Sequence, residues 1–239
     1  MRAAELRPVH VLHDAAVLAR LLGVETPCCA QLAMSTAGQP VAWGAFVEGN
    51  PLSGGWIVDV ESPSRRTVSW SGTLAAELFG DEPRTWMRSG QDCFRDFLDE
   101  VSPALHRHQR TVCFRPHHRH VLGDVHSAVK LLRDRAGEPF EVLLSPSDLL
   151  APSMLPRLEE HLARMFTHLG PVAAAIMISD VALPDDSAEE TGLLAPCPLG
   201  QGVLGTPLLA RLLHECVPVT TPVILLPQGL DAQRAVLAL

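Results

Sequence analysis

Residues 110–126, RTVCFRPHHRHVLGDVH, contain four of the chain's eleven histidines and three arginines, with no acidic residue before Asp124. Imidazoles two residues apart, such as His118 and His120, can share a zinc or another borderline metal ion. Arginine forks match the oxygens of phosphates and carboxylates, and charged imidazoles add hydrogen-bond donors. The segment could also be a solvated basic loop whose histidines bond to the backbone. A metal site, an anion site and no site therefore remain open.

Each functional possibility predicts its own residues. A metal site would use His118 and His120 for zinc or manganese, with Asp148 or Asp180 as a third ligand from a following strand. Asp148 and Asp180 are also candidates for general acid-base catalysis, although either could simply cap a turn or loop. We expect no cofactor if the anion site is correct. That site would use Arg115, His117, His118, Arg119 and His120.

The second half of the chain predicts the elements that must position these side chains. Expected strands are 111–114, 140–145, 172–179 and 222–227. Expected helices are 89–108 with an interruption at Pro103, 125–134 after an N-cap at Asp124, 153–170 from an N-cap at Ser153, 206–217, and a last one from 229. Buried strands alternating with helices indicate parallel β-α units.

The first hundred residues fit this alternation less well. A helix is expected over 9–22 and a strand over 28–34. Three short strand-like runs follow without a helix between them, at 39–49, 54–62 and 65–72. We therefore expect an irregular insertion or hairpins over residues 38–90 of a single domain spanning 1–239.

The composition excludes several classes of protein. The formal net charge of -8, from 19 Lys and Arg against 27 Asp and Glu, disfavours a nucleic-acid partner. No apolar run approaches a membrane span, and charged residues interrupt the start of the chain before a signal peptide could form. The six cysteines lack Cys-x-x-Cys spacing and lie mostly in apolar runs, which favours a cytoplasmic protein with reduced, buried thiols.

Three segments together resemble a known superfamily. They are FEVLLSPSDLLAPSMLPRLEEHLARMFTHLGPVAAAIMISDVALP, PLGQGVLGTPLLARLL and VILLPQGLDAQRAV. Their order and rhythm resemble the xylose-isomerase-like TIM barrels, a superfamily of sugar isomerases, ketose 3-epimerases and inosose dehydratases. The resemblance covers residues 90–239. It implies a (β/α)8 barrel with an active site at the C-terminal ends of the strands, where one divalent ion is held by Glu, Asp, His and Glu.

The implied metal ligands are missing at the matching positions. Arg115 stands where the first Glu is expected, and Ser145 and Asp148 stand for the Asp and His of an Asp-x-x-His motif. The remaining matches are Met177 for the metal His, Gly200-Gln201-Gly202 for a Gly-Glu-Gly loop, and Leu226 or Pro227 for the last Glu, with Gln228 the nearest polar residue. Hard cations need several anionic oxygens, which these residues do not supply.

The sequence therefore predicts a TIM barrel with a decayed metal site. We expect it to be non-catalytic, or to bind a small anionic or sugar-like molecule at the rim through the residues named above together with Gln228. One alternative is an active isomerase, epimerase or lyase with a site rebuilt from His118, His120 and Asp148. Another is a subunit of an enzyme complex, or a homodimer; an exposed Trp43 or Trp70 would mark its partner surface.

Overall fold

The strands of the computed structural model form a closed, eight-stranded barrel in the order β1-β10-β7-β6-β5-β4-β3-β2. The structure describes residues 7–14, 31–36, 42–54, 56–60, 62, 64–183 and 191–238. The strands are β1 (Val9–Asp14), β2 (Gln31–Ser35), β3 (Ala42–Phe46), β4 (Arg66–Trp70), β5 (Thr111–Arg115), β6 (Phe140–Leu144), β7 (Ala175–Ile178) and β10 (Val223–Leu225). Only β2 in the barrel runs antiparallel to its neighbours. The predicted TIM-barrel-like architecture is confirmed, with its irregularity at β1–β3.

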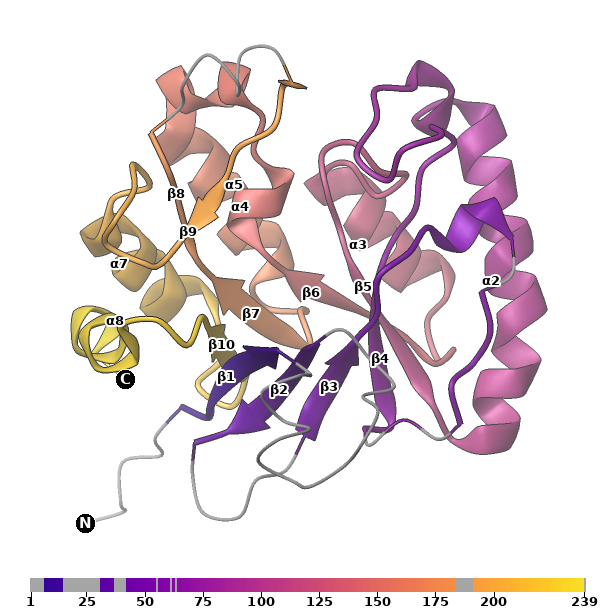
Figure 1. The fold of residues 1–239 in the computed structure, drawn as a ribbon, viewed down its shortest axis with the longest axis horizontal. Coiled ribbons are helices and arrows are strands. Elements are labelled where there is room, and N and C mark those ends of the chain that lie inside the picture. Colours follow the sequence, from indigo (N-terminus) through magenta and orange to yellow (C-terminus); the bar gives the residue numbers. More distant parts are fainter. Residues whose placement is uncertain are drawn as a thin grey trace.

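Helices connect the strands from β4 onward. They are α2 (Arg88–His108), α3 (Val125–Asp134), α4 (Pro146–Leu149), α5 (Leu158–Leu169), α7 (Thr206–Cys216) and α8 (Leu230–Leu237). Short 3-10 helices are η1 (Pro51–Ser53), η2 (Pro83–Thr85) and η3 (Pro152–Arg157), and a small sheet pairs β8 (Asp180–Val181) with β9 (Pro196–Cys197). Figure 1 shows α2 and α3 on one side of the barrel and α7 and α8 on the other. No helix in the described residues is long and apolar enough to cross a membrane.

Strand alternation separates two apolar layers. Residues facing outward, such as Val112, Phe114 and Ile176, pack in one large cluster with the helices. Residues facing inward, such as Val68 and Cys113, fill the barrel itself. The barrel is therefore a packed core, and polar side chains that point inward do so near its two ends.

Two expectations for the N-terminal third were wrong. Residues 9–14 form strand β1 and not the start of a helix, because Val9 faces the helical layer while Leu12 faces the barrel interior, a period of two. Residues 15–22 of that expected helix, and 28–30 of the expected strand, lie outside the described residues. The run 54–62 contains no strand among its described residues. The runs around β3 and β4 are strands, and β2 pairs antiparallel with β3.

Three smaller expectations also need correction. Helix α2 continues through Pro103 to His108 without a break. Ser153 is not an N-cap, because η3 occupies 152–157 and α5 begins only at Leu158. Cys93 is exposed on α2, although Cys113 is buried as expected.

Candidate functional site

Arg115 ends β5 with its side chain in the barrel mouth. Cys113 lies in the interior cluster, and alternation puts Arg115 on the same face. Pro116 follows, and proline both lacks an N–H for the ladder and favours extended backbone before it, so the strand stops at Arg115. Trp70 lies opposite Arg115 in the register of β4 with β5. The guanidinium carbon of Arg115 consequently stacks 4.3 Å from the centroid of the Trp70 ring.

Asp148 reaches Arg115 from the short helix α4. Pro146 starts this helix after an extended Ser145, which is the arrangement that proline favours at a first helical position. The Arg115 Nε donates to Asp148 Oδ2 at 2.5 Å, and Nη2 donates to Oδ1 at 3.0 Å. The two side chains are only 13% and 9% exposed. We call Arg115, Asp148 and Trp70 the upper fork; it is a bidentate, buried ion pair lying on an indole.

The resemblance implies a divalent ion at this position, and the residues present do not fit one. Both carboxylate oxygens of Asp148 accept hydrogen bonds from Arg115, whose permanent positive charge would repel a cation. The Ser145 hydroxyl lies 3.3 Å from that of Ser147, and Met177 packs in the interior cluster. The described residues contain no group of three His, Cys, Asp or Glu side chains able to hold a metal ion.

Three histidines predicted for the site pack with Phe79 and with Trp70 of the upper fork. The ring of His117 lies 4.5 Å from His118 and 5.0 Å from His120, centroid to centroid. Phe79 stacks on His120 at 5.4 Å, and Trp70 meets both His117 and His120 edge-on. We call these five residues the aromatic cluster. The structure thus brings the predicted histidines together, in contact with one another.

Hydrogen bonds determine which ring nitrogen carries the proton in His117 and in His120. The Nδ1 of His117 accepts the backbone N–H of Arg119 at 3.1 Å, which requires an unprotonated nitrogen. The Nε2 of His120 lies 2.8 Å from the Leu78 carbonyl and must donate to it. The Nδ1 of His120 is buried and has no hydrogen-bond partner among the described residues.

The ring of His118 contacts backbone carbonyls on both sides. Its Nδ1 lies 3.3 Å from the carbonyl of Asp148, which also accepts the His118 backbone N–H at 3.0 Å. Its Nε2 lies 3.1 Å from the carbonyl of Gly192. Both ring nitrogens of His118 and both carboxylate oxygens of Asp148 therefore have neighbours already, whereas His120 has only Nε2 engaged.

Burial keeps the three imidazoles uncharged at neutral pH. It is the largest influence on each and lowers the pKa of His120 to about 4, with smaller lowering from His118 and Arg115. Burial, followed by the charges of His118 and His120, lowers the pKa of His117 further still. Burial also lowers the pKa of His118, against the carbonyl bonds that raise it. The cluster thus presents no positive charge to a ligand.

Arg119, the second predicted anion-binding arginine, connects three loops. Its Nη1 lies 3.4 Å from a carboxylate oxygen of Asp81, and its Nη2 donates to the Thr191 carbonyl at 2.7 Å. Gly192 has φ of +67°, and a Cβ there would lie 2.4 Å from Arg119 Nη2, so only glycine lets the guanidinium approach this closely. The charge of Arg119, like that of Arg115, is matched by a carboxylate.

Asp180, expected either to act at the rim or to cap a loop, is buried below it. One carboxylate oxygen accepts the backbone N–H groups of Val181 and Leu204 at 2.8 and 2.9 Å, and the other accepts that of Gly200 at 3.1 Å. A Cβ on Gly202 would lie 2.1 Å from the Val181 carbonyl. This geometry favours the loop-capping alternative, in which Asp180 orders the predicted Gly-Gln-Gly bend.

Gln228 lies in the turn between β10 and α8, where it is exposed. Its carbonyl accepts a hydrogen bond from the Gln233 side chain at 2.7 Å. Its predicted part in ligand binding stays a prediction.

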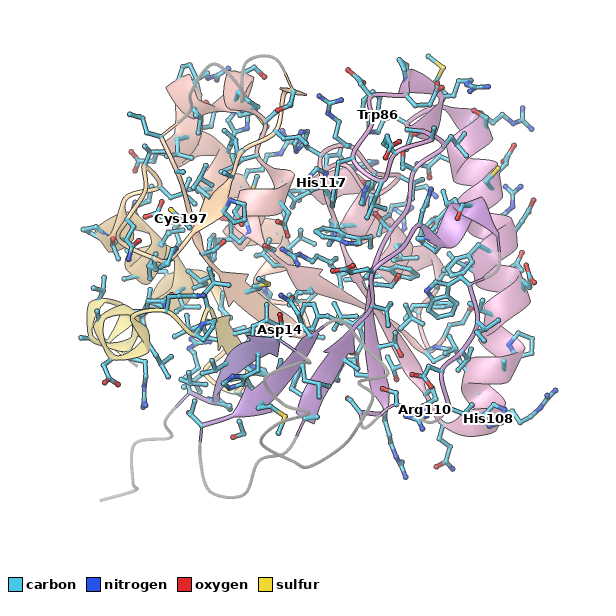
Figure 2. All side chains as sticks on the ribbon, viewed as in Figure 1. Asp14, Trp86, His108, Arg110, His117 and Cys197 are labelled. Carbon is cyan, nitrogen blue, oxygen red and sulfur yellow. The ribbon has the colours of Figure 1, made fainter. Side chains whose placement is uncertain are left out.

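A cavity of about 430 Å³ opens at the rim beside the aromatic cluster. We call it the rim pocket; its lining includes Asp81, Trp86, His118, Arg119, Ser153 and Gly192. Trp86 is 43% exposed, while Trp43 is buried and Trp56 and Trp70 are partly buried. Figure 2 shows Trp86 and His117 at the same end of the molecule, with His108 and Arg110 at the opposite end. The rim pocket thus combines an indole face with an arginine-carboxylate pair.

A second arginine fork lies at the other end of the barrel. The Arg66 Nε donates to Glu141 Oε2 at 2.5 Å, Nη2 donates to Oε1 at 3.2 Å, and Nη1 donates to the Trp43 carbonyl at 3.1 Å. The guanidinium carbon lies 4.4 Å from the centroid of a Trp43 ring. Trp43 is the extra residue where the β2–β3 register shifts, and a bulge of this kind re-aims a side chain, here inward. We call Arg66, Glu141 and Trp43 the lower fork.

Comparisons with known proteins found no matching family model and no matching curated sequence. Similar solved structures include a xylose isomerase-like TIM barrel protein from Mycobacterium smegmatis in complex with magnesium, at 13% identity over 72% of this chain and 60% of that one, with a TM-score of 0.46. D-Psicose 3-epimerase follows at 12% identity, with 68% and 50% covered and a TM-score of 0.46. A probable 3-DHS dehydratase from Bacillus anthracis matches at 12%, with 73% and 61% covered and a TM-score of 0.47.

The match spans 50% to 61% of the length of these structures. Because the identity is so low, the chemistry of the site has to be inferred from the residues of this chain. The structure brings Arg115, the histidines, Arg119 and Asp148 together at one rim, and their part in binding or catalysis stays a prediction. The sequence missed that Arg115 binds Asp148. It also missed Asp81, Trp86 and the lower fork. Arg66, Val68 and Trp70 lie two residues apart, so they face the same side of β4. This spacing could have indicated that the strand points a side chain inward at each end of the barrel.

Proposed function

We propose that the protein is a metal-independent binding protein that holds a small sugar-like molecule in the rim pocket. The observation that carries the proposal is the upper fork. Arg115 stands where the resemblance implies a metal-binding carboxylate, and its guanidinium engages both oxygens of Asp148, so Asp148 offers no free oxygen for metal-dependent proton transfer. The protein would therefore bind without the isomerase chemistry that its resemblance implies.

The charges at the rim favour a neutral polyhydroxylated ligand over an anion. Each arginine is matched by an acid, Arg115 by Asp148 and Arg119 by Asp81. The depressed imidazole pKa values remove the other source of positive charge. Hydroxyl groups both donate and accept, so a sugar can bridge a carboxylate and a guanidinium at the same time.

The shape of the rim pocket agrees with this ligand. The exposed face of Trp86 offers an apolar platform for the C–H face of a sugar ring, and aromatic faces carry the negative potential that attracts C–H groups. Asp81, Arg119 and Ser153 supply polar groups around it. A mostly pre-formed concave site with a few polar groups is typical of small-molecule sites.

The proposal is tested by titrating D-fructose, myo-inositol and D-fructose 6-phosphate into EDTA-treated protein, with NMR and calorimetric detection. We expect a polyol to bind without metal, and Trp86→Ala and Asp81→Ala to weaken it by roughly tenfold each. Met87→Ala, on the neighbouring exposed residue outside the rim pocket, is the matched control and should bind normally.

Three outcomes would contradict the proposal. Binding that requires Mn²⁺ or Zn²⁺ would favour the active enzyme with a rebuilt metal site. Binding of the phosphate ester alone would favour an anion site. No binding by any of the three probes would leave the non-catalytic subunit as the better hypothesis.

A further inference from the structure

A second cavity, of about 220 Å³, lies outside the barrel between the loop after β5 and helices α3 and α5. Its floor is apolar and consists of Val125, Leu149, Met154 and Met165. Leu149 and Met165 are fully buried, so they cannot move aside for solvent without disturbing the core. Methionine side chains adapt to irregular ligands, which suits a floor that must accept an apolar group. We call this space the outer cavity.

Basic side chains stand at the edge of the outer cavity. Arg164 lines it from α5 and forms no ion pair within the described residues. Arg157 and Arg211, by contrast, are paired with Glu160 and Glu159 respectively. Arg164 is thus an arginine at the cavity edge that forms no ion pair with a described carboxylate, although Asp124 lines the same cavity.

Two imidazoles stand beside Arg164. His126 and His161 line the same edge, and neither ring has a hydrogen-bond partner in the part of the chain that the structure describes. The one acid in the lining, Asp124, is the N-cap of α3, and its Oδ1 accepts the Ser127 N–H at 2.7 Å. One oxygen of Asp124 is therefore engaged with its own helix, while Arg164, His126 and His161 keep donors without a partner among the described residues.

We propose that the outer cavity binds a small carboxylate with an aromatic or branched apolar body. The apolar part would occupy the methionine-lined floor, and the carboxylate would accept hydrogen bonds from Arg164 and the two imidazoles. A ligand of roughly ten non-hydrogen atoms fits this space, since a cavity of about 150 Å³ accommodates benzene. This site is separate from the rim pocket, and His118 is the one described residue that lines both cavities.

Phenylacetate is the probe, and phenylacetamide, which has the same body without the charge, is its matched control. We expect phenylacetate to bind the full chain at millimolar concentration and to shift NMR signals of α3 and α5. The amide should bind at least roughly tenfold more weakly, because it loses the charge-assisted bond to Arg164.

Three variants locate the ligand. Arg164→Gln should weaken phenylacetate by roughly tenfold without a cost in folding, because the side chain is exposed and unpaired. Arg88→Gln removes an exposed arginine of α2 that lines no part of the cavity and should change nothing. Trp86→Ala should also leave phenylacetate binding unchanged, which separates this result from the proposed function of the rim pocket.

The proposal is overturned if phenylacetate does not bind, if the amide binds equally well, or if Arg164→Gln has no effect. It is also overturned if the signals that shift belong to the upper fork and not to α3 and α5.

Discussion

The two ends of the barrel carry the same three chemical groups in different settings. In the lower fork all three residues belong to strands β3, β4 and β6, and Arg66 uses a third donor on the Trp43 carbonyl. In the upper fork the carboxylate comes from the short helix α4, and His117 and His120 from the loop after β5 pack against its indole. An arginine-carboxylate pair therefore links strands at the lower end of the barrel, and a similar pair links a strand to a helix at the upper end.

The difference in burial decides how much each fork stabilises the fold. The upper pair is 13% and 9% exposed, whereas the lower pair is 26% and 32% exposed. A buried charge left without its partner costs several kcal/mol, and solvent screens the loss at a more exposed site. The two ends should thus respond unequally to the same substitution.

The largest expected effect comes from removing the carboxylates. Asp148→Ala should lower the free energy of unfolding by about 3 kcal/mol, because it leaves the Arg115 charge buried and unpaired. Glu141→Ala should lower it by about 1 kcal/mol. Urea unfolding measures both. The double variant Arg115→Met with Asp148→Leu should recover much of the free energy of unfolding that Asp148→Ala loses. Equal losses for Asp148→Ala and Glu141→Ala would contradict the expected difference between the two ends.

Acid should act mainly on the upper end. The pKa of His120 is lowered to about 4 in the folded chain, below its usual value of about 6.5, so stability is complete above pH 6.5 and is lost as pH falls towards 4. This one residue accounts for about 3 kcal/mol at pH 4, because each pKa unit is worth about 1.4 kcal/mol.

Among the described residues, His10 is an imidazole at the lower end whose pKa is also lowered. Burial, and then the charge of Arg66, lower it, so His10 adds a loss of the same sign. Thermal unfolding between pH 4 and 8 measures the sum. His120→Gln should make the loss at low pH smaller without abolishing it, because His117 and His118 keep their lowered pKa values, and exposed His108→Gln should leave the profile unchanged. A flat profile in the unmodified protein would contradict the neutral aromatic cluster.

The smallest effect is expected from the indoles. Trp70→Phe and Trp43→Phe should each cost about 1 kcal/mol, since a guanidinium over an indole is worth between 0.5 and 2 kcal/mol. The two variants should differ more in ligand binding than in stability. The Trp70 ring also contacts His117 and His120, so its replacement should weaken ligand binding, whereas Trp43→Phe should not. Equal binding by both variants would remove the functional distinction between the ends.

The sequence predicted the second half of the fold well because its strands are continuous apolar runs and its helices carry clear boundaries, such as Asp124. It misassigned β1 because both faces of VHVLHD are buried, His10 facing inward and Val9 outward. The polar and apolar residues therefore do not alternate clearly, and a helical period also fits them. The pairing of Arg115 with Asp148 spans 33 positions and depends on strand register, which a pattern of residue types does not give. The rim pocket likewise depends on loops meeting in space.

The most direct test of the central claim is elemental analysis after equilibrium dialysis of the protein against micromolar Mn²⁺ or Zn²⁺. The upper fork predicts much less than one ion per chain, and the same result for Asp148→Ala, because Arg115 already holds both oxygens of Asp148. One ion retained per chain, and lost in Asp148→Ala, would show that Asp148 is a metal ligand and would contradict the account.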